Sequence, residues 1–172
     1  MEFAQGDLIT VDGLPLHPLV VHAVVVLLPL AAVGGLVIAL RAAWRRRFWV
    51  PVLVLTVLGV GAVPVAARTG EQLQAKLPPQ NQLIQQHADL GRTLLPFAIA
   101  FGVTVILLVL AGRLADRERD AADTGGEART TWRRVAIVAA ALVAFTGVAC
   151  TVQVLRVGHS GSTAVWDGVG QN

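Results

Sequence analysis

The sequence predicts an all-α integral membrane protein that folds as a bundle of four transmembrane helices. Of its 172 residues, 55% are hydrophobic and 15% are charged, whereas soluble domains carry about 25% charged residues. The apolar residues fall into four uncharged blocks of about 20 residues each, a length that spans the hydrocarbon core of a bilayer. These features exclude a soluble globular enzyme and a disordered chain. The single cysteine also excludes a domain held together by internal disulfides.

Each apolar block is predicted to form one helix, because a segment in lipid must satisfy its own backbone hydrogen bonds. The blocks are rich in Val, Leu, Ala and Ile, and arginine flanks each of them. Pro29, Pro51, Pro64 and Pro96 lie inside or near the ends of the spans, where membrane helices tolerate proline and kink at it. The chain is therefore expected to be one domain with spans at about residues 18–40, 48–67, 93–111 and 135–155.

The distribution of basic residues predicts that both chain termini lie outside the cytoplasm. The connections after the first and third spans hold ten Lys and Arg residues, and the rest of the chain holds four. The positive-inside rule places the ten in the cytoplasm, six of them in a solvated linker at about residues 112–134. No basic segment precedes the first span, so we expect that span to be retained rather than cleaved as a signal peptide.

The sequence pI of about 10.4 follows from this topology. The arginines flank lipid-spanning segments, so the expected partner is the lipid bilayer, and nucleic acid is not expected to bind.

All four histidines are predicted to lie on the outer side of the membrane. His17 and His22 lie at the start of the first span, His87 lies before the third, and His159 lies just past the fourth. Pro18 suits the first position of a helix, with His17 as its cap. His22 then lies one turn inside the span, where an ionisable side chain faces the bundle interior or a partner. The five-residue spacing puts His17 and His22 about 140° apart around a helix, unlike the i, i+4 pair of zinc proteases.

Imidazole side chains ligate haem, zinc and copper, so the leading hypothesis is a b-type haem site for electron transfer. His22 and His87 are the first expected axial pair, because they lie on different helices and nearest the bilayer. His17 and His159 are expected to form a second pair or to give hydrogen-bonding support. The electron-transfer partner would be a separate redox protein or a quinone.

Five charged residues could support such a site. Glu71 and Asp89 could accept a hydrogen bond from the ring N–H of a ligand histidine. Arg68, Arg92 and Arg156 could pair with the propionates of a haem. An arginine at the end of a span also commonly extends to the lipid headgroups instead.

Two other functions remain open from the residues alone. The four histidines with Asp89 or Glu71 could form a zinc or copper site for metal handling or hydrolysis. Hydrolysis needs an open metal position and a general base, and the sequence shows no clear base. The chain could instead be a non-catalytic membrane scaffold or accessory subunit, with the histidines in a hydrogen-bonded cap. No catalytic residue is assigned, and enzymatic activity is neither predicted nor excluded.

Four stretches of the sequence resemble a widespread bacterial family of membrane domains of unknown function. The most specific is the H-P-x-x-x-H pattern from His17 to His22, and the similarity covers nearly the whole chain. The resemblance implies a compact four-helix domain in the bacterial inner membrane. It also implies a redox context, because relatives are fused to c-type cytochrome or Rieske-type domains. This sequence has neither, so electron transfer would need a separate partner. The stretches are residues 13–22, 68–71, 87–91 and 157–166.

The histidine-bearing segments before the first and third spans hint at a duplicated helical hairpin.

Overall fold

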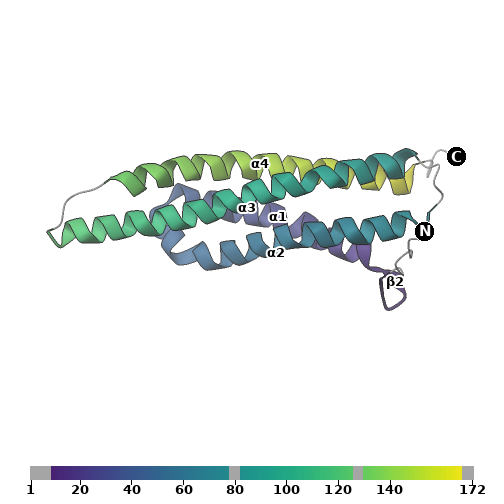
Figure 1. The fold of residues 1–172 in the computed structure, drawn as a ribbon, viewed down its shortest axis with the longest axis horizontal. Coiled ribbons are helices and arrows are strands. Elements are labelled where there is room, and N and C mark those ends of the chain that lie inside the picture. The colour runs from purple at the N-terminus through teal and green to yellow at the C-terminus, as the bar shows by residue number, and fades with distance from the viewer. Residues whose placement is uncertain (1–8, 78–81, 126–129, 168–172) are drawn as a thin grey trace, which may run out of the picture.

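The fold is a bundle of four long helices that run side by side, as Figure 1 shows for a computed structural model of the chain. The structure describes residues 9–77, 82–125 and 130–167. The helices in these ranges are all long and apolar enough to cross a membrane, so the predicted fold class is confirmed. They are α1 (Leu16–Leu40), α2 (Ala42–Gln74), α3 (Gln82–Asp123) and α4 (Thr131–Trp166).

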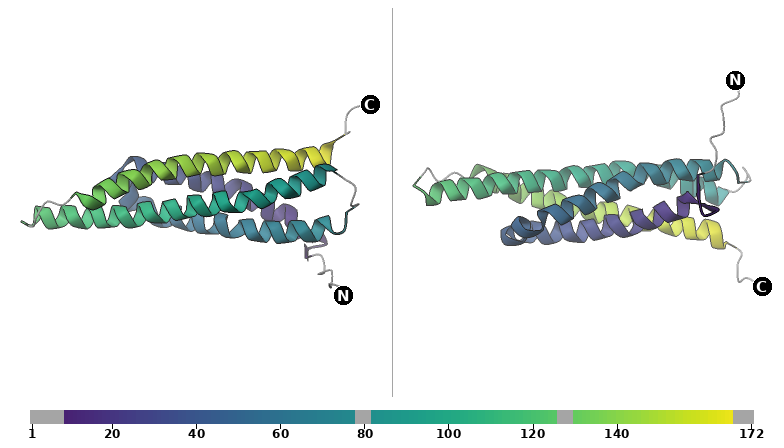
Figure 2. Two further views of the ribbon diagram at one scale, coloured as in Figure 1. Left: turned by 45° about the horizontal axis from the view of Figure 1, so that its top comes forward. Right: turned by 90° about the horizontal axis from the view of Figure 1, so that it is seen from below.

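The order of the helices around the bundle decides which side chains meet at its centre. Helix α1 packs against α2 and α4, and α3 packs against the same two helices, whereas α1 and α3 have little direct contact. Helices α1 and α3 therefore lie on one diagonal, and α2 and α4 lie on the other (Figure 2). A residue of α1 reaches a residue of α3 only across the centre of the bundle.

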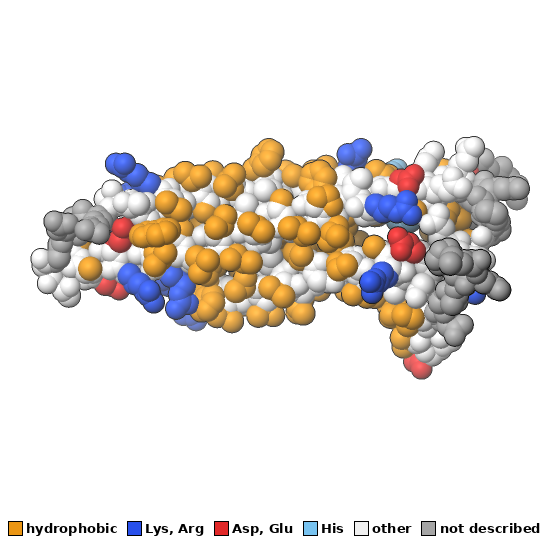
Figure 3. All heavy atoms as spheres, in the orientation of Figure 1, with side chains coloured by type: hydrophobic (Ala, Val, Ile, Leu, Met, Phe, Trp, Pro, Cys, Tyr) orange, Lys and Arg blue, Asp and Glu red, His pale blue; other side chains and the backbone are white. Residues whose placement is uncertain are grey.

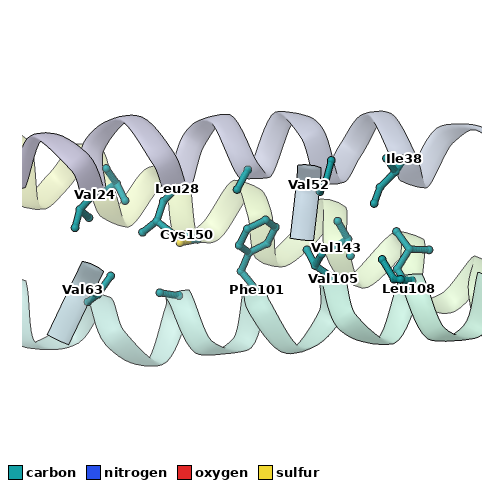
Figure 4. Close-up of a cluster of buried hydrophobic side chains, with 14 of the residues drawn as sticks. Val24, Leu28, Ile38, Val52, Val63, Phe101, Val105, Leu108, Val143 and Cys150 are labelled. Atoms are coloured by element: carbon teal, nitrogen blue, oxygen red, sulfur yellow. The ribbon is translucent and has the colours of Figure 1, made fainter. Parts of the chain in front are cut away.

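Side chains of all four helices fill the middle of the bundle (Figure 4). Phe101 of α3 is fully buried at its centre. A Cβ atom added at Gly35 of α1 or Gly147 of α4 would lie 3.5 Å or 3.4 Å from the Phe101 ring. Helices α1 and α4 therefore both pack against this aromatic side chain at these positions.

The distribution of apolar and charged side chains on the outer surface is that of a bundle that spans a membrane. In Figure 3, hydrophobic side chains cover the middle of the molecule, and charged side chains gather toward its two ends. We call this middle zone the apolar belt. Exposed members include Leu19, Val57, Ile106 and Val148, one from each helix. The side of the membrane that each end faces stays a prediction.

The helices extend beyond the predicted spans, and α3 extends into the predicted linker. Helix α3 has 42 residues, about 63 Å at 1.5 Å per residue, which is twice the thickness of the hydrocarbon core. It continues through the predicted linker at residues 112–134 as far as Asp123, because the mixed charges of that stretch favour a solvated helix. Thr124 and Gly125 form a turn after this helix, and residues 126–129 lie outside the described ranges.

The arginine-rich end of the bundle contains one buried cation. Arg45 of α2 is only 9% exposed, and its side chain lies directly against the backbone of Gly112 on α3. Arg46, the next residue, forms a 3.1 Å ion pair with Asp116. Helix α3 therefore joins α2 at this end through both packing and charge.

A short β-hairpin precedes α1, and the sequence analysis did not predict it. Strands β1 (Thr10–Val11) and β2 (Leu14–Pro15) pair antiparallel. The turn residues Asp12 and Gly13 have φ values of 50° and 78°, the left-handed values that a tight two-residue hairpin turn requires. Asp-Gly is a strong hairpin signal, so the sequence contained the information.

The helix start at Pro18 was predicted two residues too late. Helix α1 begins at Leu16, with Pro15 as its N-cap, so His17 is already helical and Pro18 is its third residue. Proline costs no hydrogen bond there, because the first N–H groups of a helix have no partner within it.

Candidate functional site

Two histidines meet at the end of the bundle where α1 and α3 begin and α2 and α4 end. We call this the histidine end. His17 lies in the first turn of α1, and His87 lies in the second turn of α3. Their ring centroids are 6.4 Å apart, and the ring planes are inclined by 71°. Because α1 and α3 lie on a diagonal, the two imidazoles meet across the centre of the bundle.

The His17 ring is held by the last turns of α2. Its Nδ1 lies 3.0 Å from the carbonyl oxygen of Ala66 and 3.5 Å from the hydroxyl oxygen of Thr69. A carbonyl can only accept a hydrogen bond, so Nδ1 carries the proton and Nε2 keeps its lone pair. A Cβ added at Gly70 would lie 2.9 Å from Cε1 of this ring, so only glycine leaves the imidazole its space.

The His87 ring is held by α4 in the same way. Its Nδ1 lies 3.0 Å from the hydroxyl oxygen of Ser160, which donates its own proton to the carbonyl of Val157 at 2.8 Å. The hydroxyl therefore accepts from Nδ1–H, and Nε2 of this ring also keeps its lone pair. A Cβ added at Gly161 would lie 3.0 Å from Cε1 of His87.

We call the residues that hold each ring its seat, and the seats of His17 and His87 match residue by residue. In each, a glycine lies against the ring, a hydroxyl residue precedes it, and a backbone carbonyl lies four residues before it. The hint of a duplicated hairpin therefore has a structural counterpart, since α1–α2 and α3–α4 each provide one imidazole and one seat. The matched segments are Ala66–Gly70 and Val157–Gly161.

A cavity of about 580 Å³ opens beside the histidine pair. All four helices line it, mostly with apolar side chains such as Val21, Val63, Leu94 and Val154. The two glycines of the seats also face it. Its size and apolar character are typical of a small-molecule or cofactor site.

His87 pairs with His17, whereas the sequence predicted His22 as its partner. His22 is exposed, and its Nδ1 lies 2.6 Å from the carbonyl oxygen of Pro18 in its own helix. It lines the cavity from the side of α1. The five-residue spacing explains the difference, because it turns His22 away from the face that His17 presents to the centre.

His159 does not contribute to the cavity. It is exposed on α4 and is not among the residues that line the cavity. The stretch around it is rich in glycine and lies past the predicted span, yet α4 continues as a helix to Trp166. Packing of Gly161 against His87 accounts for this order, since tertiary contacts override the weak helix propensity of glycine.

Among the charged residues that were predicted to support the site, Glu71 and Arg92 line the cavity. Arg92 lies 4.0 Å from Glu71 on α2 and 3.1 Å from Asp89 on its own helix. Asp89 is largely exposed, and Arg68 and Arg156 are also exposed and do not line the cavity. Arg92 is thus the only one of the three predicted arginines that reaches the cavity.

Within the described residues, no three or more His, Cys, Asp or Glu side chains form a group that could hold a metal ion. The four histidines are therefore not gathered into one cluster, and the arrangement offers two neighbouring imidazoles beside an apolar cavity. Sequence reasoning did not assign the roles of Gly70, Thr69, Ser160 and Gly161. The repeated pattern of a hydroxyl residue before glycine was the available signal.

Comparison with known proteins gives a family but no relative of known activity. The sequence matches the model of a family described as "Predicted membrane protein (DUF2231)" over residues 13–172. No curated protein and no solved structure gave a significant match. The match covers nearly the whole chain and agrees with the four apolar helices, so the predicted kinship is confirmed. The chain therefore belongs to the DUF2231 family of predicted membrane proteins.

Proposed function

We propose that this protein binds a b-type haem at its histidine end and takes part in electron transfer, with His17 and His87 as the two axial ligands. The observation that carries the proposal is the pairing of these two imidazoles, from diagonal helices, at a centroid separation of 6.4 Å. Bundle interiors commonly hold cofactors between side chains of facing helices.

The separation of the rings favours two ligands on opposite sides of one metal. A metal–nitrogen bond is about 2.0–2.1 Å long and a ring nitrogen lies about 1.2 Å from its centroid, so opposed imidazoles have centroids about 6.4 Å apart. Two imidazoles at a tetrahedral angle would have centroids only about 5 Å apart by the same arithmetic. The observed 6.4 Å is compatible with the opposed arrangement, and it is also the separation of two rings in an edge-to-face contact.

The hydrogen bonds of the rings support the same proposal. A ligand histidine characteristically donates its other ring N–H to a carbonyl or a similar acceptor, which fixes its orientation and tautomer. The Ala66 carbonyl does this for His17, and the Ser160 hydroxyl does it for His87. Both Nε2 atoms thereby keep the lone pair that a metal needs.

The cavity supports a large apolar cofactor with an anionic edge. Its volume of about 580 Å³ and its apolar lining would keep water from a planar macrocycle, and Arg92 would pair with a carboxylate at the rim. Haem supplies one-electron chemistry when bound, while the protein sets the axial ligands and the access of solvent.

The proposal places the protein in the bacterial inner membrane with both termini extracytoplasmic. The arginine-rich end would then face the cytoplasm under the positive-inside rule. The histidine end would exchange electrons with a redox protein or a quinone on the outer side.

Zinc or copper is the second candidate, and a scaffold role is the third. Structural zinc takes four protein ligands, and catalytic zinc takes three. The described residues bring only the two imidazoles together, so the site fits haem better than tetrahedral zinc.

Visible spectra of the oxidised and dithionite-reduced protein would test the proposal. The protein would be purified in detergent from cells supplied with haem, and the metal content of the same sample would be measured. We expect a sharp reduced α-band that is lost in His17→Ala and in His87→Ala. His159→Ala is the matched control, because this exposed histidine lies outside the cavity, and it should keep the band.

A protein that folds without haem would overturn the proposal. Stoichiometric zinc or copper would then favour the metal site, and the absence of any cofactor would favour the scaffold. A full α-band in His17→Ala would refute the assignment of the ligands.

A further inference from the structure

The hairpin before α1 has one apolar face and one more polar face. Val11 and Leu14 are directly paired across the two strands, so their side chains point to the same face. The carbonyl oxygen of Ile9 accepts a hydrogen bond from the N–H of Leu16 at 2.9 Å, so the pairing continues to Ile9 and alternation places its side chain on that face as well. Thr10 and Pro15 form the other pair and point to the opposite face.

The apolar face of the hairpin is exposed. Ile9, Val11 and Leu14 are 48%, 44% and 64% exposed. Three neighbouring aliphatic side chains on one face of a protruding hairpin indicate a surface that is covered by something else.

The position of the hairpin indicates a lipid surface. Figure 3 shows the hairpin projecting sideways from the histidine end, with hydrophobic side chains on the flank that faces the apolar belt. Leu19, one turn into α1, belongs to the apolar belt and is 50% exposed. Asp12 lies at the tip of the hairpin, beyond the apolar pair.

We propose that this hairpin rests on the membrane surface, with Ile9, Val11 and Leu14 inserted at the boundary of headgroups and acyl chains. Amphipathic elements lie in this plane with their apolar face buried about 5–10 Å. Water and headgroups there can satisfy the free edges of the strands, which the hydrocarbon core could not do. The hairpin would also fix the depth of His17, which follows Pro15 by two residues.

Site-directed spin labelling in lipid vesicles tests this proposal. Leu14→Cys would carry the nitroxide in a Cys150→Ala background, and the protein would be reconstituted in vesicles of phosphatidylcholine and phosphatidylglycerol. Collision of the label with oxygen, which concentrates in lipid, is compared with collision with a water-soluble nickel chelate. Thr10→Cys on the opposite face is the matched control, and Val57→Cys on α2, which is 58% exposed in the apolar belt, is the lipid reference.

We expect the Leu14 label to collide preferentially with oxygen, as the Val57 label does, and the Thr10 label to collide several-fold more with the nickel chelate. Equal nickel access at Leu14 and Thr10 would overturn the proposal, because both faces would then lie in water. Spectral broadening of the Leu14 label that disappears on dilution with unlabelled protein would also overturn it, because a second copy of the chain would then cover the face.

Discussion

The contact between Gly70 and the His17 ring predicts that a single methyl group at this position destabilises the protein. In Gly70→Ala, the new Cβ would lie 2.9 Å from Cε1 and 3.1 Å from Nδ1 of His17, closer than side-chain atoms normally approach. Either α2 shifts or the ring swings away and loses its hydrogen bond to the Ala66 carbonyl. Overpacking of this kind costs about 1–3 kcal/mol.

A second glycine on the same helix separates this effect from helix propensity. Alanine stabilises a helix interior by about 1 kcal/mol relative to glycine, at any position that has room for it. A Cβ added at Gly61 of α2 would meet no atom within 4 Å, so Gly61→Ala gains the propensity without a clash. The difference between the two variants therefore isolates the clash at about 1–3 kcal/mol.

Thermal unfolding in detergent, followed by retention of the folded peak in size-exclusion chromatography, would measure this difference. At about 2–4 °C per kcal/mol for a chain of this size, Gly70→Ala should unfold roughly 2–12 °C below Gly61→Ala. Gly161→Ala and Gly158→Ala form an independent pair on α4, because a Cβ meets His87 at Gly161 and nothing within 4 Å at Gly158. Equal unfolding temperatures within both pairs would refute the reasoning that glycine makes room for the histidines.

Three further predictions follow from other contacts. Ser160→Ala should weaken haem binding by about tenfold, because His87 loses the hydroxyl that lies 3.0 Å from its Nδ1. Thr69→Ala should have less effect, because its hydroxyl lies 3.5 Å from Nδ1 of His17 and the Ala66 carbonyl, at 3.0 Å, still holds that ring. Haem titration of both variants measures this difference. Gly112→Ala should destabilise the protein by about 1–3 kcal/mol by displacing the buried Arg45, which a lower unfolding temperature than that of Gly61→Ala would reveal. Phe101→Ala should cost about 3–5 kcal/mol through the cavity it leaves, and an unfolding temperature close to wild type would contradict the described core.

The sequence was sufficient for the fold but not for the pairing of the histidines. Long uncharged blocks permit only helices in lipid, so the number and type of the elements followed from hydropathy. The spacing of His17 and His22 correctly placed them on different faces of α1. Which of the two faces the centre depends on the rotation of α1 and on the diagonal placement of α3, and these are properties of the packed bundle. The sequence predicted His22 as the partner of His87 because it lies deeper in the span, but the packed bundle presents His17 to the centre.

Hydropathy alone also did not predict where the helices end. The stretch up to Asp123 is too polar to span a membrane and yet continues α3, because helix formation needs only backbone hydrogen bonds and suitable residues. The segment around Gly158 and Gly161 looks like a flexible tail by composition, and contact with His87 makes it part of α4. In both places, hydropathy predicts the part of the helix that can lie within the membrane, and the helix itself is longer.

The matched seats of His17 and His87 have a consequence for the origin of the molecule. Each pair of consecutive helices supplies one histidine ring and one seat. Two copies of a single two-helix chain, related by a twofold axis, would therefore build the same pair of histidines at the centre of a bundle. The present chain has the form expected when such a homodimer is fused through gene duplication. Fusion would then have freed the two halves to diverge, and their second histidines now occupy different places, His22 on α1 and His159 on α4.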